Sequence, residues 1–401
     1  MTFEQRATWV LALSLLACGG TDAVTVADAS ATDGSTALDG GTTGDAGDLP
    51  DGGGALGCVD PPGTVVAAPV MEKRTVENAT ARNAICNDGT PAVYYIRRGT
   101  GCGAKRWVLG LEGGGSCNTL AECAARGPGL RGTSGAAASK NGTGILSPDA
   151  AANPDFFTAN AVYVEYCSSD NWAGHRAASA DTGNFAFYGK DIVAAVLEDL
   201  SKAENLGEAQ EALLVGSSAG GLGVLANADA LQARLPKARV RAVNDAGWVA
   251  DILAFAPAGG SGQPSYTEFD ARFAYWSAQV DASCAAAETT HLGKCSIGST
   301  IFPQLTVPLF VHQDQRDPVQ LKMLGLEGAS NQAERNAYLS TFRTAITSSL
   351  GPVTGVFSPR VGDHGLVFSP DFNVRALEGT TYREALGNWY FERQGPKRLV
   401  E

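Results

Sequence analysis

The sequence predicts an α/β fold with a mostly parallel central sheet and helices on both of its faces. Short apolar runs typical of buried strands recur along the chain, and each gives way to a glycine-rich or polar turn. One of these turns leads directly into a stretch with helical spacing of apolar residues, and another helical stretch separates two later strands. This alternation of strand and helix is typical of a parallel sheet covered by helices.

The expected elements follow in chain order. A first apolar strand, Trp107 to Leu111, breaks at three glycines. A second strand, Ala212 to Val215, ends in glycine and is followed from Leu222 by apolar residues at near-helical spacing. The remaining expected elements are strands over Arg239 to Val243, Val307 to Val311 and Val353 to Phe357, and helices over Asn331 to Ser349 and Tyr382 to Gln394.

The first 57 residues are not expected to belong to this fold. The apolar run Val10 to Ala17 is too short to span a bilayer and ends at Cys18, so residues 1–18 resemble a bacterial lipoprotein signal with Cys18 as the acylated residue. The alternative is plain secretion with cleavage near the same point. Residues 19–57 hold seven Asp and no Lys or Arg among Gly, Ala, Thr and Ser, which predicts a disordered acidic linker. Residues 58–401 are enough for a single domain.

Charge and cysteine content restrict the class of protein. The net charge of -12 argues against a nucleic-acid partner. An even number of cysteines behind an export signal indicates disulfides in an oxidising compartment, and the absence of any CxxC pair argues against a structural metal. We therefore expect an exported protein of the bacterial cell envelope, lipid-anchored or secreted, without metal or cofactor. Spacing alone fixes no pairing among the eight cysteines after Cys18, which are Cys58, Cys86, Cys102, Cys117, Cys123, Cys167, Cys284 and Cys295.

One short motif suggests a nucleophile. Gly216-Ser217-Ser218-Ala219-Gly220 matches G-x-S-x-G, the elbow that presents a catalytic serine between a strand and a helix. The pattern alone is weak, because 49 of the 401 residues are glycine. Its position between an expected strand and an expected helix strengthens it. Ser218 is therefore the candidate nucleophile.

The chain has only four histidines from which a general base can come. His175 precedes the serine, and His291 lies between two cysteines in an expected disulfide loop. His312 is expected at the end of a strand, partly buried and bonded to a backbone group. His364 lies on a loop after the last strand of the alternating pattern, where an α/β hydrolase carries its base.

Several further residues are expected near the serine. Asp314 and Asp317 both follow a strand, at the sheet edge where α/β active sites lie, and either can orient the base. Asp245 also follows a strand and is expected to serve as a hydrogen-bonding support of the site loops. Trp172 is expected to line the cleft. The order serine, aspartate, histidine is that of the α/β-hydrolase fold, which is the fold class that we predict.

A glycine-rich loop offers the remaining part of an esterase site. Gly113-Gly114-Gly115 follows the strand Trp107 to Leu111 and resembles the HGGG-type loop of esterases. Its free N–H groups, together with that of Ala219, can bind the negative charge that develops on a carbonyl oxygen during acyl transfer.

Longer segments resemble the pectin acetylesterase/Notum family of carboxylesterases. They include CNDGTPAVYYIRRG from Cys86, RWVLGLEGGGSCNT from Arg106, YCSSDNWAG from Tyr166 and LLVGSSAGGLGVL from Leu213. PLFVHQDQRDPVQL from Pro308 continues the series. The resemblance implies Ser218, Asp317 and His364 as catalytic residues, Gly114, Gly115 and Ala219 as oxyanion donors, and disulfides Cys86–Cys167, Cys117–Cys123 and Cys284–Cys295, which leaves Cys58 with Cys102.

The resemblance implies a serine carboxylesterase, and we expect a monomer acting on short-chain O-acyl esters of a small molecule or a polysaccharide. One alternative is a Notum-like deacylase that removes a longer fatty acyl chain from protein or lipid. Ser116 stands where the family usually has an aromatic residue, which leaves the acyl pocket open or differently shaped. Another alternative, an inactive module that binds glycan or lipid, is disfavoured because the serine, aspartate and histidine are all present.

Overall fold

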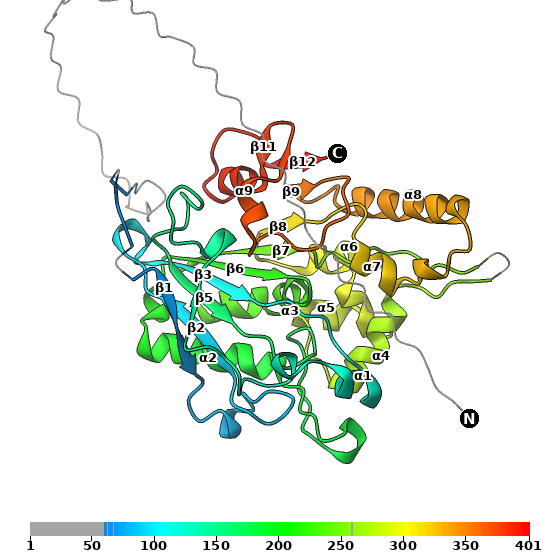
Figure 1. The fold of residues 1–401 in the computed structure, drawn as a ribbon, viewed down its shortest axis with the longest axis horizontal. Coiled ribbons are helices and arrows are strands. Elements are labelled where there is room, and N and C mark those ends of the chain that lie inside the picture. Colours follow the sequence, from blue (N-terminus) through cyan, green and yellow to red (C-terminus); the bar gives the residue numbers. More distant parts are fainter. Residues whose placement is uncertain (1–59, 62, 67, 258–259) are drawn as a thin grey trace, which may run out of the picture. The chain divides into compact units, whose positions relative to one another are not determined.

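The computed structural model describes residues 60–61, 63–66, 68–257 and 260–401. The expected signal and linker, with Cys18, lie outside this part, as does Cys58. Within it, one sheet has the strand order β12-β9-β8-β7-β6-β3-β5-β2-β1-β4 (Figure 1). Its strands are β1 Val70–Thr75, β2 Val93–Arg97, β3 Arg106–Leu111, β4 Ser139–Asn141, β5 Asn160–Val164, β6 Glu211–Ser217, β7 Arg239–Asp245, β8 Leu309–His312, β9 Gly355–Ser358 and β12 Arg398–Val400; β10 Ala376–Leu377 and β11 Thr380–Thr381 form a separate pair.

The sheet is mostly parallel, as predicted. All neighbouring strands from β12 to β5 pair in parallel, while β2, β1 and β4 extend the sheet by antiparallel pairing. Because parallel strands point the same way, the loops that follow β3, β6, β7, β8 and β9 all leave from one edge of the sheet. This edge carries the residues that the sequence singles out.

Helices pack on both faces of the sheet. In β6, Leu214 belongs to a cluster with side chains of α2, α3 and α8, whereas its neighbour Val215 belongs to a second cluster with side chains of α9. This alternation is the strand period of two, and both faces are apolar because both are covered. The helices are α1 Leu120–Ala125, α2 Gly189–Ala203, α3 Ala219–Arg234, α4 Tyr266–Trp276, α5 Ala282–Ala287, α6 Gly298–Ile301, α7 Pro318–Met323, α8 Gln332–Ser349 and α9 Tyr382–Tyr390.

The two largest differences from the sequence-based boundaries lie at helix ends and have local reasons. Helix α3 begins at Ala219 rather than near Leu222, because Ser218 is already its N-cap residue and no loop separates it from β6. Helix α9 ends at Tyr390 rather than Gln394, because Glu392 has a positive φ of 56° and breaks the helical path.

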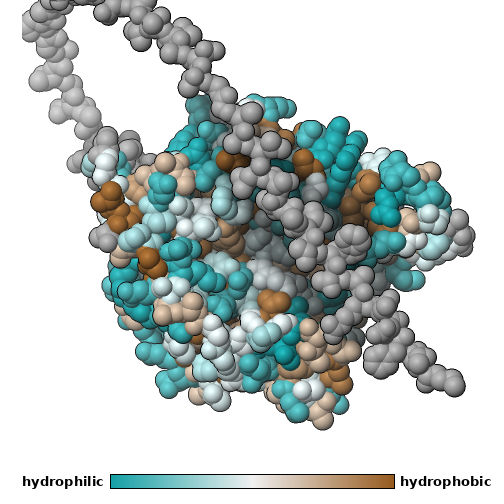
Figure 2. All heavy atoms as spheres, viewed as in Figure 1, coloured by the Kyte–Doolittle hydropathy of each residue, from teal (hydrophilic) through white to brown (hydrophobic). Residues whose placement is uncertain are grey.

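Hydrophobic side chains on the surface shown in Figure 2 form small, scattered groups. The large apolar residues exposed in the described part include Leu253, Val319 and Val374, and isolated exposures of this kind are usual for globular proteins. Among the helices of the described residues, none is both long enough and apolar enough to cross a membrane.

Three disulfides connect segments of the described chain. Cys86–Cys167, Cys117–Cys123 and Cys284–Cys295 are formed, in agreement with the pairing implied by the resemblance. The first joins residues 81 apart in sequence, and the second joins residues only 6 apart. The pairing expected for Cys58 stays a prediction.

These separations predict different contributions to stability. A disulfide that closes a longer loop removes more entropy from the unfolded chain. Replacing Cys86 and Cys167 by Ala is expected to lower the free energy of unfolding by about 4 kcal/mol, and replacing Cys117 and Cys123 by about 2 kcal/mol. Urea unfolding of both double variants measures the difference. Equal losses would contradict the loop-entropy account.

Candidate active site

Ser218 lies at the sharp turn between β6 and α3. Its backbone has φ 59° and ψ -119°, a conformation that non-glycine residues rarely adopt and that costs on the order of 1–3 kcal/mol. The Ser218 N–H donates to the Asp245 carbonyl oxygen at 2.8 Å, which ties the turn to the end of β7. The side chain is thereby presented at the edge of the sheet and lines a cavity.

Two glycines of the motif make this turn possible. A Cβ atom on Gly216 would lie 2.0 Å from the Gly220 carbonyl oxygen, and one on Gly220 would lie 2.1 Å from the Leu111 carbonyl oxygen. Both distances are far below van der Waals contact, so only glycine fits at either position. The G-x-S-x-G spacing is therefore a packing requirement of the turn.

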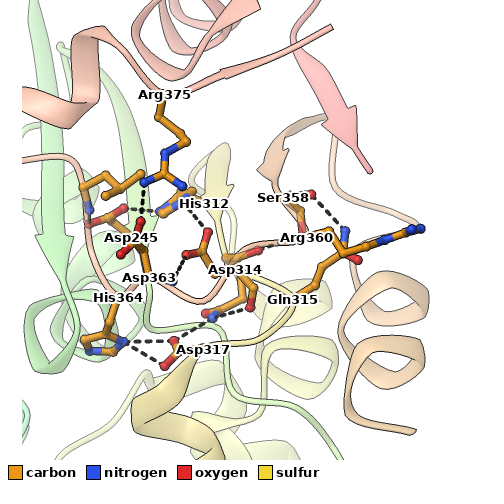
Figure 3. Close-up of polar contacts among 12 residues, drawn as sticks. Asp245, His312, Asp314, Gln315, Asp317, Ser358, Arg360, Asp363, His364 and Arg375 are labelled. Carbon is orange, nitrogen blue, oxygen red and sulfur yellow. Dashed lines mark hydrogen bonds and ion pairs between the residues drawn. The ribbon is translucent and has the colours of Figure 1, made fainter. Parts of the chain in front are cut away.

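His364 contacts Ser218 and Asp317 at the same time. Its Nε2 lies 2.7 Å from the Ser218 Oγ, and its Nδ1 lies 2.9 Å and 3.0 Å from the two carboxylate oxygens of Asp317 (the histidine and aspartate are drawn in Figure 3). The structure thus brings together the serine, histidine and aspartate that the sequence singles out. Hydrogen bonds in this order can transfer the serine proton to an oriented imidazole.

Asp317 is held by its own surroundings. It is the N-cap of α7, where Oδ1 accepts from the backbone N–H groups of Val319 and Gln320, and Oδ2 accepts from the Gln313 side chain at 2.8 Å. It is fully buried. The alternative carboxylate, Asp314, does not contact His364 but accepts from the Asp363 N–H at 2.6 Å.

The environment of His364 changes its acidity. Burial disfavours the charged imidazolium, but the hydrogen bond to Asp317 and the charge of that carboxylate outweigh burial and raise the pKa of His364 above its ordinary value of 6.5. A higher pKa makes the imidazole a stronger base for the serine proton.

Backbone N–H groups near Ser218 are candidate donors. Within the described part of the chain, the N–H groups of Gly114, Gly115 and Ala219 donate no hydrogen bond to a protein acceptor. Gly115 and Ala219 line the cavity next to Ser218 and His364. Ala219 is also the first residue of α3, where the helix dipole favours negative charge. These donors can bind an oxyanion that forms at the serine.

The glycine loop is fixed by a side chain that the sequence did not single out. The Arg126 guanidinium donates to the carbonyl oxygens of Gly114 at 2.7 Å, Gly115 at 3.4 Å and Ser116 at 3.4 Å. Three carbonyl groups therefore share one cation, which holds the loop in one conformation. Because Arg126 lies in a region of low sequence complexity, no motif marked it.

The cavity next to Ser218 has a volume of about 300 Å³. One side of it is polar, because the Arg272 guanidinium donates to the Ser116 hydroxyl at 2.5 Å and Lys322 also lines the space. The remaining lining is largely apolar and includes Leu222, Val249, Phe269, Val319 and Met323. A cavity of this kind suits an apolar group next to a polar one.

Two expectations for this region are wrong. Trp172 does not line the cavity: it is fully buried, and its indole N–H donates to the Glu112 carbonyl oxygen at 3.0 Å. His312 is fully buried rather than partly buried, and it contacts the carboxylates of Asp245 and Asp314 rather than a backbone group. Strand position alone did not indicate these partners.

The other histidines form pairs outside the Ser218–His364–Asp317 contacts. His175 Nδ1 lies 2.7 Å from Asp191, and His291 Nδ1 lies 2.9 Å from Asp270. Asp245 meets its expectation as a support, because its Oδ2 accepts from the backbone N–H groups of Leu366 and Val367.

Known proteins are similar to this chain in sequence. Palmitoleoyl-protein carboxylesterase notum1a of Danio rerio is 32% identical over 341 residues, which cover 80% of this chain and 65% of that protein. Palmitoleoyl-protein carboxylesterase NOTUM of Homo sapiens is 31% identical, covering 76% of this chain and 63% of that protein. The chain thus spans somewhat less than two-thirds of the length of these relatives.

A solved structure is similar as well. The Wnt deacylase Notum from Drosophila superposes with a TM-score of 0.75 at 30% identity, covering 83% of this chain and 96% of that one. The predicted α/β-hydrolase fold is confirmed by this similarity. The pectinacetylesterase family matches residues 66–401, which is nearly the whole described part. The chain therefore belongs to the pectin acetylesterase/Notum family of carboxylesterases.

Proposed function

We propose that this protein is a serine carboxylesterase that hydrolyses short-chain O-acyl esters through Ser218, His364 and Asp317. The observation that carries the proposal is the continuous contact from the Ser218 hydroxyl through the His364 ring to the Asp317 carboxylate, next to the unpaired N–H groups of Gly115 and Ala219 in one cavity. Nucleophile, base and oxyanion donors are the three parts that acyl transfer requires.

The first half of the reaction forms an acyl-enzyme. The Ser218 oxygen attacks the ester carbonyl carbon while His364 Nε2 accepts the hydroxyl proton. The carbonyl oxygen becomes negatively charged and accepts hydrogen bonds from Gly114, Gly115 and Ala219. The bond to the alcohol oxygen then breaks, and the alcohol leaves with the proton that His364 returns.

The second half releases the acid. Water attacks the acyl-enzyme carbon and gives a proton to His364, the same donors bind the second oxyanion, and the Ser218 oxygen leaves with the proton. Asp317 accepts from Nδ1 throughout, which keeps Nε2 free to accept and stabilises the imidazolium. No cofactor takes part in this scheme.

The cavity supports a short acyl chain. Its volume of about 300 Å³ is at the lower end of the range for ligand pockets, and Arg272 and Lys322 interrupt its apolar lining. An acetylated polysaccharide is a substrate class that fits the family description. The three disulfides agree with an exported protein, and lipid attachment at Cys18 stays a prediction.

A second candidate is the removal of a longer acyl chain from protein or lipid. The similarity to palmitoleoyl-protein carboxylesterases and the apolar lining by Leu222, Val249 and Phe269 favour it. Chain-length preference separates the two candidates.

The Ser218→Ala variant tests the reaction itself. We expect the full chain to hydrolyse p-nitrophenyl esters and the variant to lose about 10⁵–10⁶-fold in kcat, because no other group forms the acyl-enzyme. Initial rates measure the loss. A Ser340→Ala variant, at an exposed serine of α8, is the control and is expected to keep activity. Turnover that persists in Ser218→Ala would reject this nucleophile, and a folded wild type without turnover would favour a binding module.

The pH dependence of kcat/KM tests the base. Only neutral His364 can accept the serine proton, so activity falls as pH drops through its pKa, and the raised pKa places this fall above the ordinary value of 6.5. Asp317→Asn removes a carboxylate charge that raises the pKa, so its acid limb is expected at lower pH, with a rate reduced about 10⁴-fold. A wild-type rate that stays constant below the ordinary pKa of imidazole would contradict this role of His364.

The chain-length optimum tests the pocket. With p-nitrophenyl esters from acetate to palmitate, kcat/KM is expected to peak at a short chain. Ser116→Trp adds bulk to the cavity wall and should shift the optimum to a still shorter chain, whereas Ser116→Ala, which adds none, should not. A peak at long chains would select the second candidate.

A further inference from the structure

A second group of charged residues lies next to the candidate site and has no part in the scheme above. His312, at the end of β8, lies between Asp245, at the end of β7, and Asp314, in the loop after β8 (Figure 3). All three side chains are 0–1% exposed. We refer to Asp245, His312 and Asp314 as the buried cluster.

The imidazole of His312 bridges the two carboxylates. Its Nδ1 lies 2.5 Å from Asp245 Oδ1, and its Nε2 lies 3.3 Å from Asp314 Oδ1. The ring stacks on Tyr382, with 4.8 Å between ring centroids. Nδ1 makes the hydrogen bond to Asp245, whereas Nε2 lies within ion-pair distance of Asp314 without a hydrogen bond, so the cluster has the geometry of one cation held unequally by two anions.

Each carboxylate also holds backbone next to the base. On one side of His364, Asp314 Oδ2 accepts from the Asp363 N–H at 2.6 Å. On the other side, Asp245 Oδ2 accepts from the N–H groups of Leu366 at 2.9 Å and Val367 at 3.2 Å. The loop that carries His364 is therefore held on both sides of the histidine. Asp314 of the buried cluster holds the residue before it, and Asp245 holds the residues after it.

The loop approaches the cluster closely. Gly365 has a φ of 78°, and a Cβ atom on it would lie 2.2 Å from the Ser217 Oγ and 3.4 Å from the Asp245 Oδ2. The backbone immediately after His364 is thus packed against the end of β6, where Ser218 begins its turn. A shift of this loop would move the imidazole relative to the serine.

Electrostatics agree with a charged cluster. Burial disfavours the charged forms, but the charge and hydrogen bond of Asp245 and the neighbouring Asp314 raise the pKa of His312 to about 9, and the charge and hydrogen bond of His312 lower the pKa of Asp245. His312 is thus a cation at neutral pH and cannot act as a base there. Since the desolvation of a buried ion pair largely offsets its attraction, stability alone does not account for the cluster.

We propose that the buried cluster is a positioning group for the catalytic base: by holding the backbone on both sides of His364, it keeps the imidazole aligned between Ser218 and Asp317. Its residues touch neither substrate nor the reacting atoms. The proposal rests on the proposed function of His364. A displacement of about 1 Å at a reacting group can cost on the order of 10²-fold in rate.

The Asp314→Ala variant removes one of the two anchors. We expect kcat to fall about 10–10²-fold with KM nearly unchanged, because alignment for proton transfer is lost while the cavity is not touched. Asp314→Asn keeps an oxygen that can accept from the Asp363 N–H and is expected to recover most of the loss. His312→Gln can pair with only one carboxylate and should lower kcat by a smaller factor, about 10-fold.

A control of matched stability separates positioning from general destabilisation. Asn160 is buried at the start of β5, at the opposite edge of the sheet, where its amide donates to the carbonyl oxygens of Ala104 and Arg106. Asn160→Ala also removes buried hydrogen bonds, and we expect it to lower Tm while leaving kcat within about two-fold. Crystal structures of the wild type and of Asp314→Ala give a second measure, the distance from His364 Nε2 to Ser218 Oγ.

The outcomes of this experiment are distinct. The proposal holds if two results are found together. Asp314→Ala and Asn160→Ala lose the same Tm but kcat falls further in Asp314→Ala, and the crystal structure of Asp314→Ala shows His364 displaced from Ser218. It is overturned if Asp314→Ala keeps kcat, or if His364 keeps its place in the structure of the variant. If the wild type shows no turnover that depends on Ser218, the proposed function fails instead, and the crystal structures alone decide whether the cluster positions the loop.

Discussion

The candidate site depends on the close approach of two backbone segments at the turn after β6. Gly216 and Gly220 leave no room for a Cβ atom, and the contact between them forces Ser218 into a backbone conformation that is unfavourable for serine. The turn is maintained because β6 lies in the middle of the sheet, paired in parallel with β3 and β7. Strain at one residue is thus supported by the hydrogen bonds of three strands.

The parallel alignment of the strands brings the other residues of the candidate site to the same edge of the sheet. The segments directly after β3, β6, β8 and β9 carry the proposed oxyanion donors, nucleophile, orienting carboxylate and base, and the end of β7 carries Asp245, which accepts from the backbone of the His364 loop. Residues separated by more than 200 positions meet because every one of these strands ends at the same edge. Asp317 combines two contacts, since one carboxylate caps helix α7 and lies within hydrogen-bond distance of His364 Nδ1.

The sequence predicted the parts of the site that local chemistry determines. The glycines around Ser218 form a short motif between a predicted strand and a predicted helix, and His364 was predicted from its place on the loop after a predicted strand. The buried setting of His312 could not be predicted, because one partner comes from the neighbouring strand β7 and the contact with the other depends on how the loop after β8 folds back. The contact of Arg126 with the glycine loop could not be predicted either, because only the folded loop brings its three carbonyl oxygens together around the guanidinium.

The antiparallel edge and several helices were also not anticipated. In β1 the single buried residue, Met71, lies among exposed and half-buried ones, which gives little of the apolar pattern that marks the central strands. Helix α2 has an apolar side that packs on the sheet, but its sequence carries no chemical motif and the helix was not predicted. Helix α2 is strongly amphipathic, so its sequence pattern was not weak; most of the elements that were predicted are those next to a chemical motif.

Two histidines in this site illustrate how surroundings decide the role of one side chain. His364 faces one carboxylate and a cavity, so its second nitrogen is available to a serine proton. His312 is fully buried between two carboxylates, with Nδ1 hydrogen-bonded to Asp245 and Nε2 within ion-pair distance of Asp314; burial opposes the charged ring, but the two carboxylates raise its pKa to about 9. A reactive imidazole needs a neighbour that does not move, and an imidazole held between two anchored carboxylates provides one. The same chemical group is therefore suited to proton transfer in one place and to holding geometry in the other.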